Sequence, residues 1–195
     1  MSDKTFRMID NYIYLYHTKT LVVIPTYPEQ LQDSMEVEFS SAHPLSRSAP
    51  IFSYVKSGPR SVQISLSLHR DMLNDINIAE SKLNVKELAE ADYVDILINN
   101  LQSMALPRYA ATEKMVDPPL IAVRFGNQLF IKGVVIGSVS VTYSGPILST
   151  DKYALADISF NISEVDPYDA IGVAKLGSLR GLSTDLERSW GISRT

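Results

Sequence analysis

The amino-acid sequence predicts a mainly β fold with one packed α-helix, an α+β arrangement. Two observations indicate strands: apolar and polar residues alternate from Ser61 to Leu68, and three β-rich segments follow one another between Pro118 and Val165. Alternation with a period of two is typical of a strand that buries one face. The third observation is an apolar stripe with helical spacing inside residues 84–106. Such a stripe is typical of a helix that covers a sheet.

The N-terminal part contains three short strand candidates and one long loop. Residues 12–16 and 21–24 are rich in β-forming side chains, and a polar break separates them. Residues 35–40 alternate between apolar and charged or polar side chains, which predicts a strand with a charged outer face. Residues 40–59 contain three prolines, one of which belongs to a Gly-Pro pair, so we expect a loop there. A long loop in a compact domain is usually functional.

The strongest strand signal follows this loop. Its apolar face consists of Val62, Ile64, Leu66 and Leu68. Burying four such side chains is worth roughly 6–12 kcal/mol before entropy is subtracted. We therefore expect this face to be fixed toward the core.

The middle of the chain predicts a helical insertion at about residues 84–106. Asn84 and Glu87 resemble a capping box, and Pro107 ends the pattern. The stripe consists of Val94, Leu97, Ile98, Leu101, Met104 and Ala105. Asp92 and Asp95 lie near the expected helix start, where the helix dipole favours acids. We interpret these two carboxylates as dipole complements rather than as a general acid and base.

The segment from Pro118 to Val165 predicts a three-stranded antiparallel meander. Gly126-Asn127 suits a two-residue hairpin turn, and Gly145-Pro146 with Ser149-Thr150-Asp151 predicts a loop before the last strand. Glycines at positions 133, 137 and 145 lie along a strand pattern, where glycine marks a bulge or a close backbone approach. The last strand alternates between an apolar face and a polar one. The polar face consists of Asp157, Ser159, Asn161 and Ser163.

The chain is thus expected to form one domain over residues 1–166, followed by a tail at residues 167–195. Three glycines in the tail each cost a helix about 1 kcal/mol relative to alanine, so we expect weak intrinsic order. Its apolar residues at near-helical spacing are candidates for partner binding: Leu176, Leu179, Leu182, Leu186 and Trp190. Folding of the tail back onto its own domain is an equal alternative.

Composition excludes several classes of function. A net charge of −4 gives no electrostatic basis for polyanion binding. The absence of cysteine excludes disulfides and thiolate metal sites. We expect no secretory signal, because no apolar core follows Met1, and no run of about 20 apolar residues that would span a membrane.

The sequence offers little material for catalysis. Its three histidines, His17, His43 and His69, form no metal-binding spacing. His69 and Asp71 follow the strongest strand and could pair as a base and its orienting group, but a solvated strand-end turn explains them better. We therefore predict a non-enzyme with no catalytic residues, no metal and no cofactor.

Several short motifs occur in a recognisable order. They are Ile24-Pro25-Thr26-Tyr27-Pro28-Glu29, Ser57-Gly58-Pro59-Arg60, Val116-Asp117-Pro118-Pro119, Phe125-Gly126 and a final Ile162-Ser163-Glu164-Val165. This order resembles the tube-protein family of contractile injection systems and the related tail-tube and baseplate-hub proteins of myophages, over residues 20–166. The family often has Trp-Gly at the position of Phe125-Gly126. It often has Pro-x-Arg-Ala before the last strand, which this chain lacks.

The resemblance implies a tail-tube-like antiparallel β-sandwich or barrel that assembles into a hexameric ring around a DNA channel. It implies a structural virion protein of the tail or baseplate, assembled in the host cytoplasm: a tube initiator or an adaptor between hub and tube. The implied partners are further copies of the chain, tube, hub or spike proteins and baseplate wedge proteins, with DNA only in passage and no membrane. The polar residues of the last strand are then candidates for the channel lining, and residues 40–59 and 74–91 for contacts between rings.

Two other functions remain open from the sequence. One is an enzyme that uses His69 and Asp71. The other is a monomeric tail-tip module that binds carbohydrate or a receptor, with Tyr12, Tyr14 and Tyr16 as a stacking platform. Ordinary strand aromatics are the simpler explanation of these tyrosines.

Overall fold

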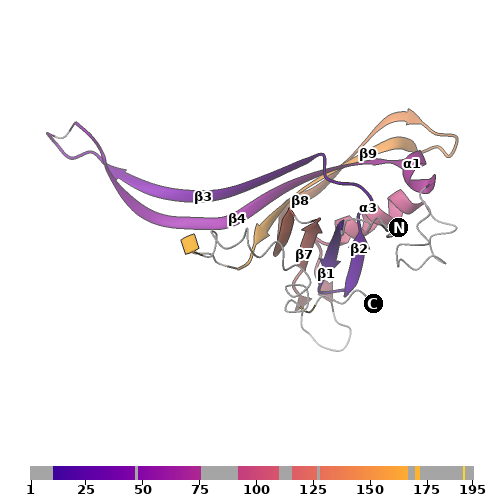
Figure 1. Ribbon diagram of the computed structural model, residues 1–195, viewed down its shortest axis with the longest axis horizontal. Coiled ribbons are helices and arrows are strands. Elements are labelled where there is room, and N and C mark those ends of the chain that lie inside the picture. Colours follow the sequence, from indigo (N-terminus) through magenta and orange to yellow (C-terminus); the bar gives the residue numbers. More distant parts are fainter. Residues whose placement is uncertain are drawn as a thin grey trace, which may run out of the picture.

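A seven-stranded antiparallel sheet dominates the computed structural model, which describes residues 11–46, 48–75, 92–109, 116–126, 128–166, 170–171 and 191 (Figure 1). Its strand order is β2-β1-β7-β8-β9-β4-β3, and the sheet does not close into a barrel. The strands are β1 (Asn11–Leu15), β2 (Thr20–Val23), β3 (Gln30–Ala42), β4 (Ile51–His69), β7 (Leu120–Phe125), β8 (Leu129–Ile147) and β9 (Tyr153–Glu164). The mainly β class with a packed helix is therefore confirmed.

Smaller elements surround the sheet. Helix α1 (Arg70–Asp75) follows β4 directly, and helix α3 (Tyr93–Ser103) precedes a two-stranded pair of β5 (Arg108–Tyr109) and β6 (Val116–Asp117). No helix in the described ranges is both long and apolar enough to cross a membrane.

The core lies between the sheet and α3. The predicted apolar face of β4 is fully buried, as are Ile158 and Ile162 of β9. The helical stripe is confirmed: Val94, Leu97, Ile98, Leu101 and Met104 are all buried in the same cluster. The helix begins at Asp92, whose carboxylate accepts a hydrogen bond from the Val94 amide. The capping-box residues Asn84 and Glu87 lie outside the described residues.

The predicted meander is confirmed, since β7, β8 and β9 are consecutive antiparallel neighbours. Of the loop predicted at Gly145-Pro146 and Ser149-Thr150-Asp151, the second part is confirmed and the first part is wrong. Strand β8 continues to Ile147 through a register shift, and the reversal occurs at residues 148–152. The ladder between β8 and β9 has a register shift at Gly145 and Pro146. Gly145 adopts a φ of 86° there, which is typical of an irregularity in a strand.

The loop predicted at residues 40–59 is also wrong. Most of this segment forms the outer half of a β-hairpin, which we call the arm: residues 35–42 of β3 and 51–60 of β4 (Figure 1). The arm projects away from the rest of the sheet. Its glycine and proline are tolerated because this part of β4 pairs only with β3 in the described structure, so Pro59 lies in an edge-like position.

Candidate assembly surfaces

One face of the sheet, opposite α3, is covered with small polar side chains. Residues paired directly across an antiparallel ladder point to the same face, so the register defines this surface. We call it the polar face; it comprises Gln30, Gln32, Ser34, Ser61, Gln63, Ser65, Ser67, Ser140, Thr142, Asp157, Ser159, Asn161 and Ser163. The four residues that the sequence nominated for a channel lining all lie on it.

Among the residues named for the polar face, Asp157 is the one charged side chain. On β8 the same face also carries Val134 and Ile136, which pair with Ser163 and Asn161, and Lys132 at the same alternation. Two pairs of side chains are hydrogen-bonded across the ladder: Ser67 Oγ donates to Asp157 Oδ1 at 2.6 Å, and Ser61 Oγ donates to Asn161 Oδ1 at 2.8 Å. The part of the face over β3, β4 and β9 between Gln30 and Ser163 is therefore uncharged except for Asp157.

The strands of the sheet are staggered, which leaves two long open edges. Strand β3 has 13 residues and, among the described residues, pairs only with β4, so its other side is an edge of the described sheet. Strand β8 pairs with β7 only as far as Val134, and from Val135 to Ile147 its one partner in the described ranges is β9. Strands β8, β9, β4 and β3 thus form a four-stranded unit with an open edge on each side within the described structure.

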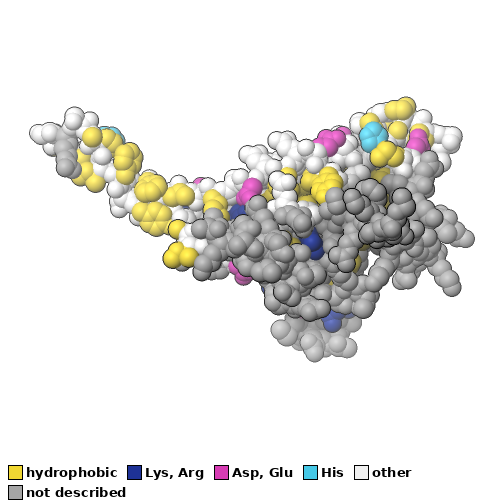
Figure 2. Space-filling view, in the orientation of Figure 1, with side chains coloured by type: hydrophobic (Ala, Val, Ile, Leu, Met, Phe, Trp, Pro, Cys, Tyr) yellow, Lys and Arg dark blue, Asp and Glu magenta, His cyan; other side chains and the backbone are white. Residues whose placement is uncertain are grey.

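The arm exposes a row of large apolar side chains. These residues, which we call the apolar strip, are Met35, Val37, Phe39, Phe52 and Tyr54, and each is between 43% and 66% exposed. They extend the core-facing side of the sheet outward, because Leu31 and Asp33 precede them at the same alternation (Figure 2). The sequence predicted a charged outer face for β3 but did not reveal that its apolar face is exposed as well.

An ion pair between Arg60 and Asp33 lies between the apolar strip and the core; Arg60 is buried, whereas the Asp33 side chain is 38% exposed. Arg60 is almost fully buried and donates from Nε to Asp33 Oδ1 at 2.9 Å and from its terminal nitrogen to Asp33 Oδ2 at 2.6 Å. A second terminal nitrogen lies 3.8 Å from the buried carboxylate of Glu164, the last residue of β9. These contacts fix the base of the arm to the end of β9.

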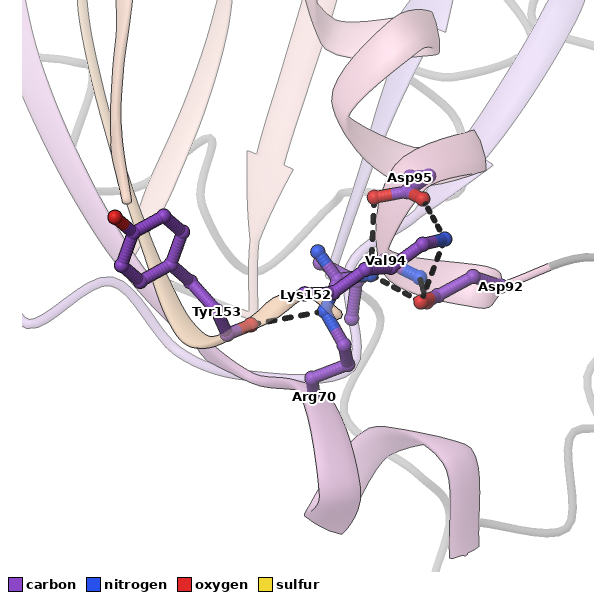
Figure 3. A network of polar contacts seen from close by, with 6 residues as sticks. All are labelled: Arg70, Asp92, Val94, Asp95, Lys152 and Tyr153. Atoms are coloured by element: carbon purple, nitrogen blue, oxygen red, sulfur yellow. Dashed lines mark hydrogen bonds and ion pairs between the residues drawn. The ribbon is translucent and has the colours of Figure 1, made fainter. Parts of the chain in front are cut away.

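A second charged group lies beside α1 and α3, at the end of the sheet away from the arm (Figure 1), and Figure 3 shows it from close by. We call it the charge cluster: Arg70 at the start of α1, Asp92 and Asp95 at the start of α3, and Lys152 in the β8–β9 turn. Arg70 donates to both carboxylates, at 2.9 Å for Asp95, and its Nε donates to the Tyr153 carbonyl at 3.0 Å. Lys152 also contacts both carboxylates, at 3.3 Å for Asp92.

Hydrogen bonds within the charge cluster favour the charged forms of Asp95 and Lys152. Burial alone would raise the pKa of Asp95, but hydrogen bonds from Lys152 and Arg70 outweigh it and hold that pKa below its usual value. The hydrogen bond to Asp95 raises the pKa of Lys152. The sequence predicted the helix-start position of both aspartates. It missed their cationic partners, because the ladder between β4 and β9 brings Arg70 and Lys152 together from distant parts of the chain.

The remaining candidates from the sequence are the tyrosines near β1, the pair His69 and Asp71, and the apolar residues of the C-terminal tail. Tyr12 and Tyr14 are buried, so they do not present an open stacking platform; the Tyr14 and Tyr16 rings contact each other edge to face at 5.0 Å. His69 and Asp71 are both exposed. The predicted partner-binding residues Leu176, Leu179, Leu182, Leu186 and Trp190 lie outside the described residues. The chain matches no protein-family model and no curated protein.

Proposed function

We propose that this chain is a structural protein that assembles into a closed ring of a phage tail tube or baseplate hub, as a tube initiator or an adaptor between hub and tube. The observation that carries the proposal is the pair of open edges on one four-stranded unit. An unpaired edge presents a row of backbone donors and acceptors that another strand can satisfy. The two edges lie on opposite sides of the unit, so edge pairing is head to tail.

Head-to-tail pairing generates a ring when the rotation between copies closes. Pairing of β3 in one copy with the open half of β8 in the next would join the four-stranded units into a continuous sheet. Both open stretches are long: β3 spans Gln30–Ala42, and the free part of β8 runs from Val135 to Ile147. Ring closure would satisfy both edges without any additional element.

The polar face supports a channel lining in such a ring. The core and α3 occupy the other side of the sheet, so the closed sheet would turn its polar face inward and its helix layer outward. The part of this face that is rich in serine, glutamine and asparagine carries no lysine or arginine, and attraction to DNA comes chiefly from such cationic side chains. The face would thus let DNA pass without holding it.

The arm supports contacts between rings. Its apolar strip is exposed in the single chain, and a two-stranded ribbon is marginally stable in water on its own. The sequence nominated residues 40–59 for such contacts, and this segment forms most of the arm. Neighbouring tube, hub or wedge proteins are the partners for this surface. The proposed location of the chain is the virion tail or baseplate, after assembly in the host cytoplasm.

Disulfide trapping tests the ring directly, since the chain has no native cysteine. Ser34→Cys places a thiol on β3, and Thr142→Cys places one on the open half of β8, both on the polar face. Within one copy, β9 and β4 lie between these strands, and Ser34 is level with Ser163 whereas Thr142 is level with Asp157, so the thiols are more than about 14 Å apart. That distance exceeds the reach of a disulfide. Any cross-link between the two positions therefore joins two copies.

We expect the double variant to give a ladder of covalent oligomers that ends at a closed hexamer on non-reducing gels. A small scan, with Ser140→Cys in place of Thr142→Cys, covers the neighbouring register. Each single-cysteine variant is the matched control and should give at most a dimer. The ring would be rejected if the double variants remain monomeric throughout the scan and the native protein is also monomeric at the same concentrations.

A further inference from the structure

We infer that the charge cluster is a latch that holds the end of the β8–β9 hairpin against α3 and thereby sets the direction of the open β8 edge. The latch consists of Arg70, Asp92, Asp95 and Lys152 (Figure 3). Its effect on assembly rests on the proposed ring function, whereas its effect on the hairpin does not.

The end of the β8–β9 hairpin needs such a latch because it has no neighbour in the sheet. The ladder between β4 and β9 stops at the pair His69 and Leu155, where β4 gives way to α1. Residues 145–154, which we call the tip, therefore continue only as a two-stranded ribbon in the described structure. A ribbon of this kind is marginally stable by itself.

The packing at the tip is mostly exposed. Tyr143 and Tyr153 stack with ring centroids 6.4 Å apart, yet each is nearly half exposed, and Ile147 is 64% exposed. The turn itself has two backbone hydrogen bonds, from Leu148 to Lys152 at 2.8 Å and from Asp151 to Leu148 at 3.0 Å. Apolar burial is thus a weak source of order at the tip, and the charged contacts become its main fixed attachment.

The geometry of the charge cluster suits this role. Arg70 is almost fully buried and reaches both the Tyr153 carbonyl in the tip and the two carboxylates on α3. Lys152 bridges the same two carboxylates from the turn. Each carboxylate therefore accepts from two cations, and the tip is tied at two adjacent residues. A shared network of charge-assisted bonds fixes direction better than a single ion pair.

The consequence for assembly follows from where the tip lies. It is the far end of the open β8 edge, so a tip that swings away from α3 also turns that edge. Strand pairing between copies requires the edge to match its partner over several residues. The latch would thus preorganise the edge before a second copy arrives, which lowers the entropic cost of pairing.

Amide hydrogen exchange in the monomer tests the latch. Lys152→Met removes the charge and retains the length of the side chain. We expect the Leu148 and Asp151 amides to exchange about two- to fivefold faster, while the amides of Ile64 and Ile158 in the core stay unchanged. Lys152→Arg should restore slow exchange at the tip. Asp95→Asn removes one of the two carboxylates that both cations contact and should loosen the tip in the same way.

The matched control is Lys56→Met, which breaks the exposed ion pair between Lys56 and Glu38 on the arm. It should leave the tip amides unchanged. Unchanged tip exchange in both Lys152→Met and Asp95→Asn would overturn the latch. Equal acceleration of tip and core amides would also overturn it, because the cluster would then stabilise only the global fold.

The link to assembly uses the disulfide trapping described above. Lys152→Met should lower the yield of cross-links between Ser34→Cys and Thr142→Cys at least twofold, and Lys56→Met should not. A loosened tip with unchanged cross-linking would reject the effect of the latch on the edge. If the parent double-cysteine variant forms no cross-link, the ring proposal fails, and the exchange measurement alone still decides whether the latch exists.

Discussion

At the scale of single residues, Gly133 illustrates how a backbone requirement appears in the sequence. A glycine in a strand pattern predicted a bulge or a close backbone approach, and the structure confirms the approach. A Cβ atom at position 133 would lie 2.2 Å from the Ser163 carbonyl oxygen and 2.9 Å from the Ile162 side chain. Real Cβ atoms do not tolerate such contacts, so β8 and β9 can approach each other this closely only because residue 133 has no side chain.

Gly133→Ala should therefore destabilise the fold by about 1–3 kcal/mol, because the ladder must move apart to admit a methyl group. Chemical denaturation measures this change in the free energy of unfolding. Ser138→Ala, on the exposed part of the same strand, is the control and should change stability by less than about 0.5 kcal/mol. Equal stability of Gly133→Ala and the native chain would show that the two strands adjust freely.

His17 gives a prediction about pH. Its side chain is buried, and its Nδ1 atom has no hydrogen-bond partner within the described part of the chain. Burial lowers the pKa of His17; the Ser103 carbonyl and Asp117 oppose this effect, and Arg108 adds to it. The folded state thus keeps the imidazole neutral, whereas the unfolded chain takes up a proton below about pH 6.5. Stability should therefore fall as the pH drops below that value.

This pH dependence is measurable by unfolding the native chain and His17→Gln at several values between about pH 7.5 and pH 5.5. The native chain should lose more stability across this window than the variant, because only the native chain gains a proton on unfolding at position 17. Parallel curves for the native chain and His17→Gln would contradict the prediction.

At the scale of elements, the alternation of apolar and polar residues correctly predicted which faces of the strands are buried in the core. Strand β4 and strand β9 each bury four apolar residues on one face, and these periodic patterns alone identified the buried sides. The stripe of α3 was equally clear because a helix that covers a sheet must repeat apolar residues every three or four positions. These elements were predictable because burial leaves a local periodic trace.

The arm was not predictable by the same reasoning. Its prolines and Gly-Pro pair suggested a loop, yet they lie in the turn or in a strand whose second side is unpaired. Alternation in β3 correctly indicated a strand but wrongly suggested burial of the apolar face. The pattern is the same whether the covering surface belongs to this chain or to another one. A sequence cannot distinguish the two cases by periodicity.

At the scale of the whole molecule, the order of strands determines the candidate function. Strand β4 lies next to β9, about ninety residues away in the sequence, and no local signal specifies that pairing. The stagger that leaves β3 and half of β8 open depends on the lengths of several strands at once. The polar residues of β9 were identified from the sequence. The polar row of β4 was also visible as alternation in the sequence, but its alignment with the rows on β3, β8 and β9 became visible only through the register.

The charge of the polar face gives the last prediction. If this face lines a channel for DNA, cationic side chains on it should make assembled rings retain DNA. The change is Gln63→Lys combined with Ser159→Lys, two positions on adjacent strands of the polar face. Binding of a labelled duplex should rise and should fall steeply between about 50 mM and 200 mM salt, because each new phosphate contact releases a counterion.

The control adds the same charge elsewhere, with Ser149→Lys and Thr150→Lys in the exposed β8–β9 turn. As monomers, the two double variants should bind DNA equally weakly, since their net charges are equal. As rings, only the polar-face variant should retain the duplex, because lysines from all copies would then converge on one channel. Equal retention by both rings would place the polar face outside the channel and would leave the open edges as the only support for a ring.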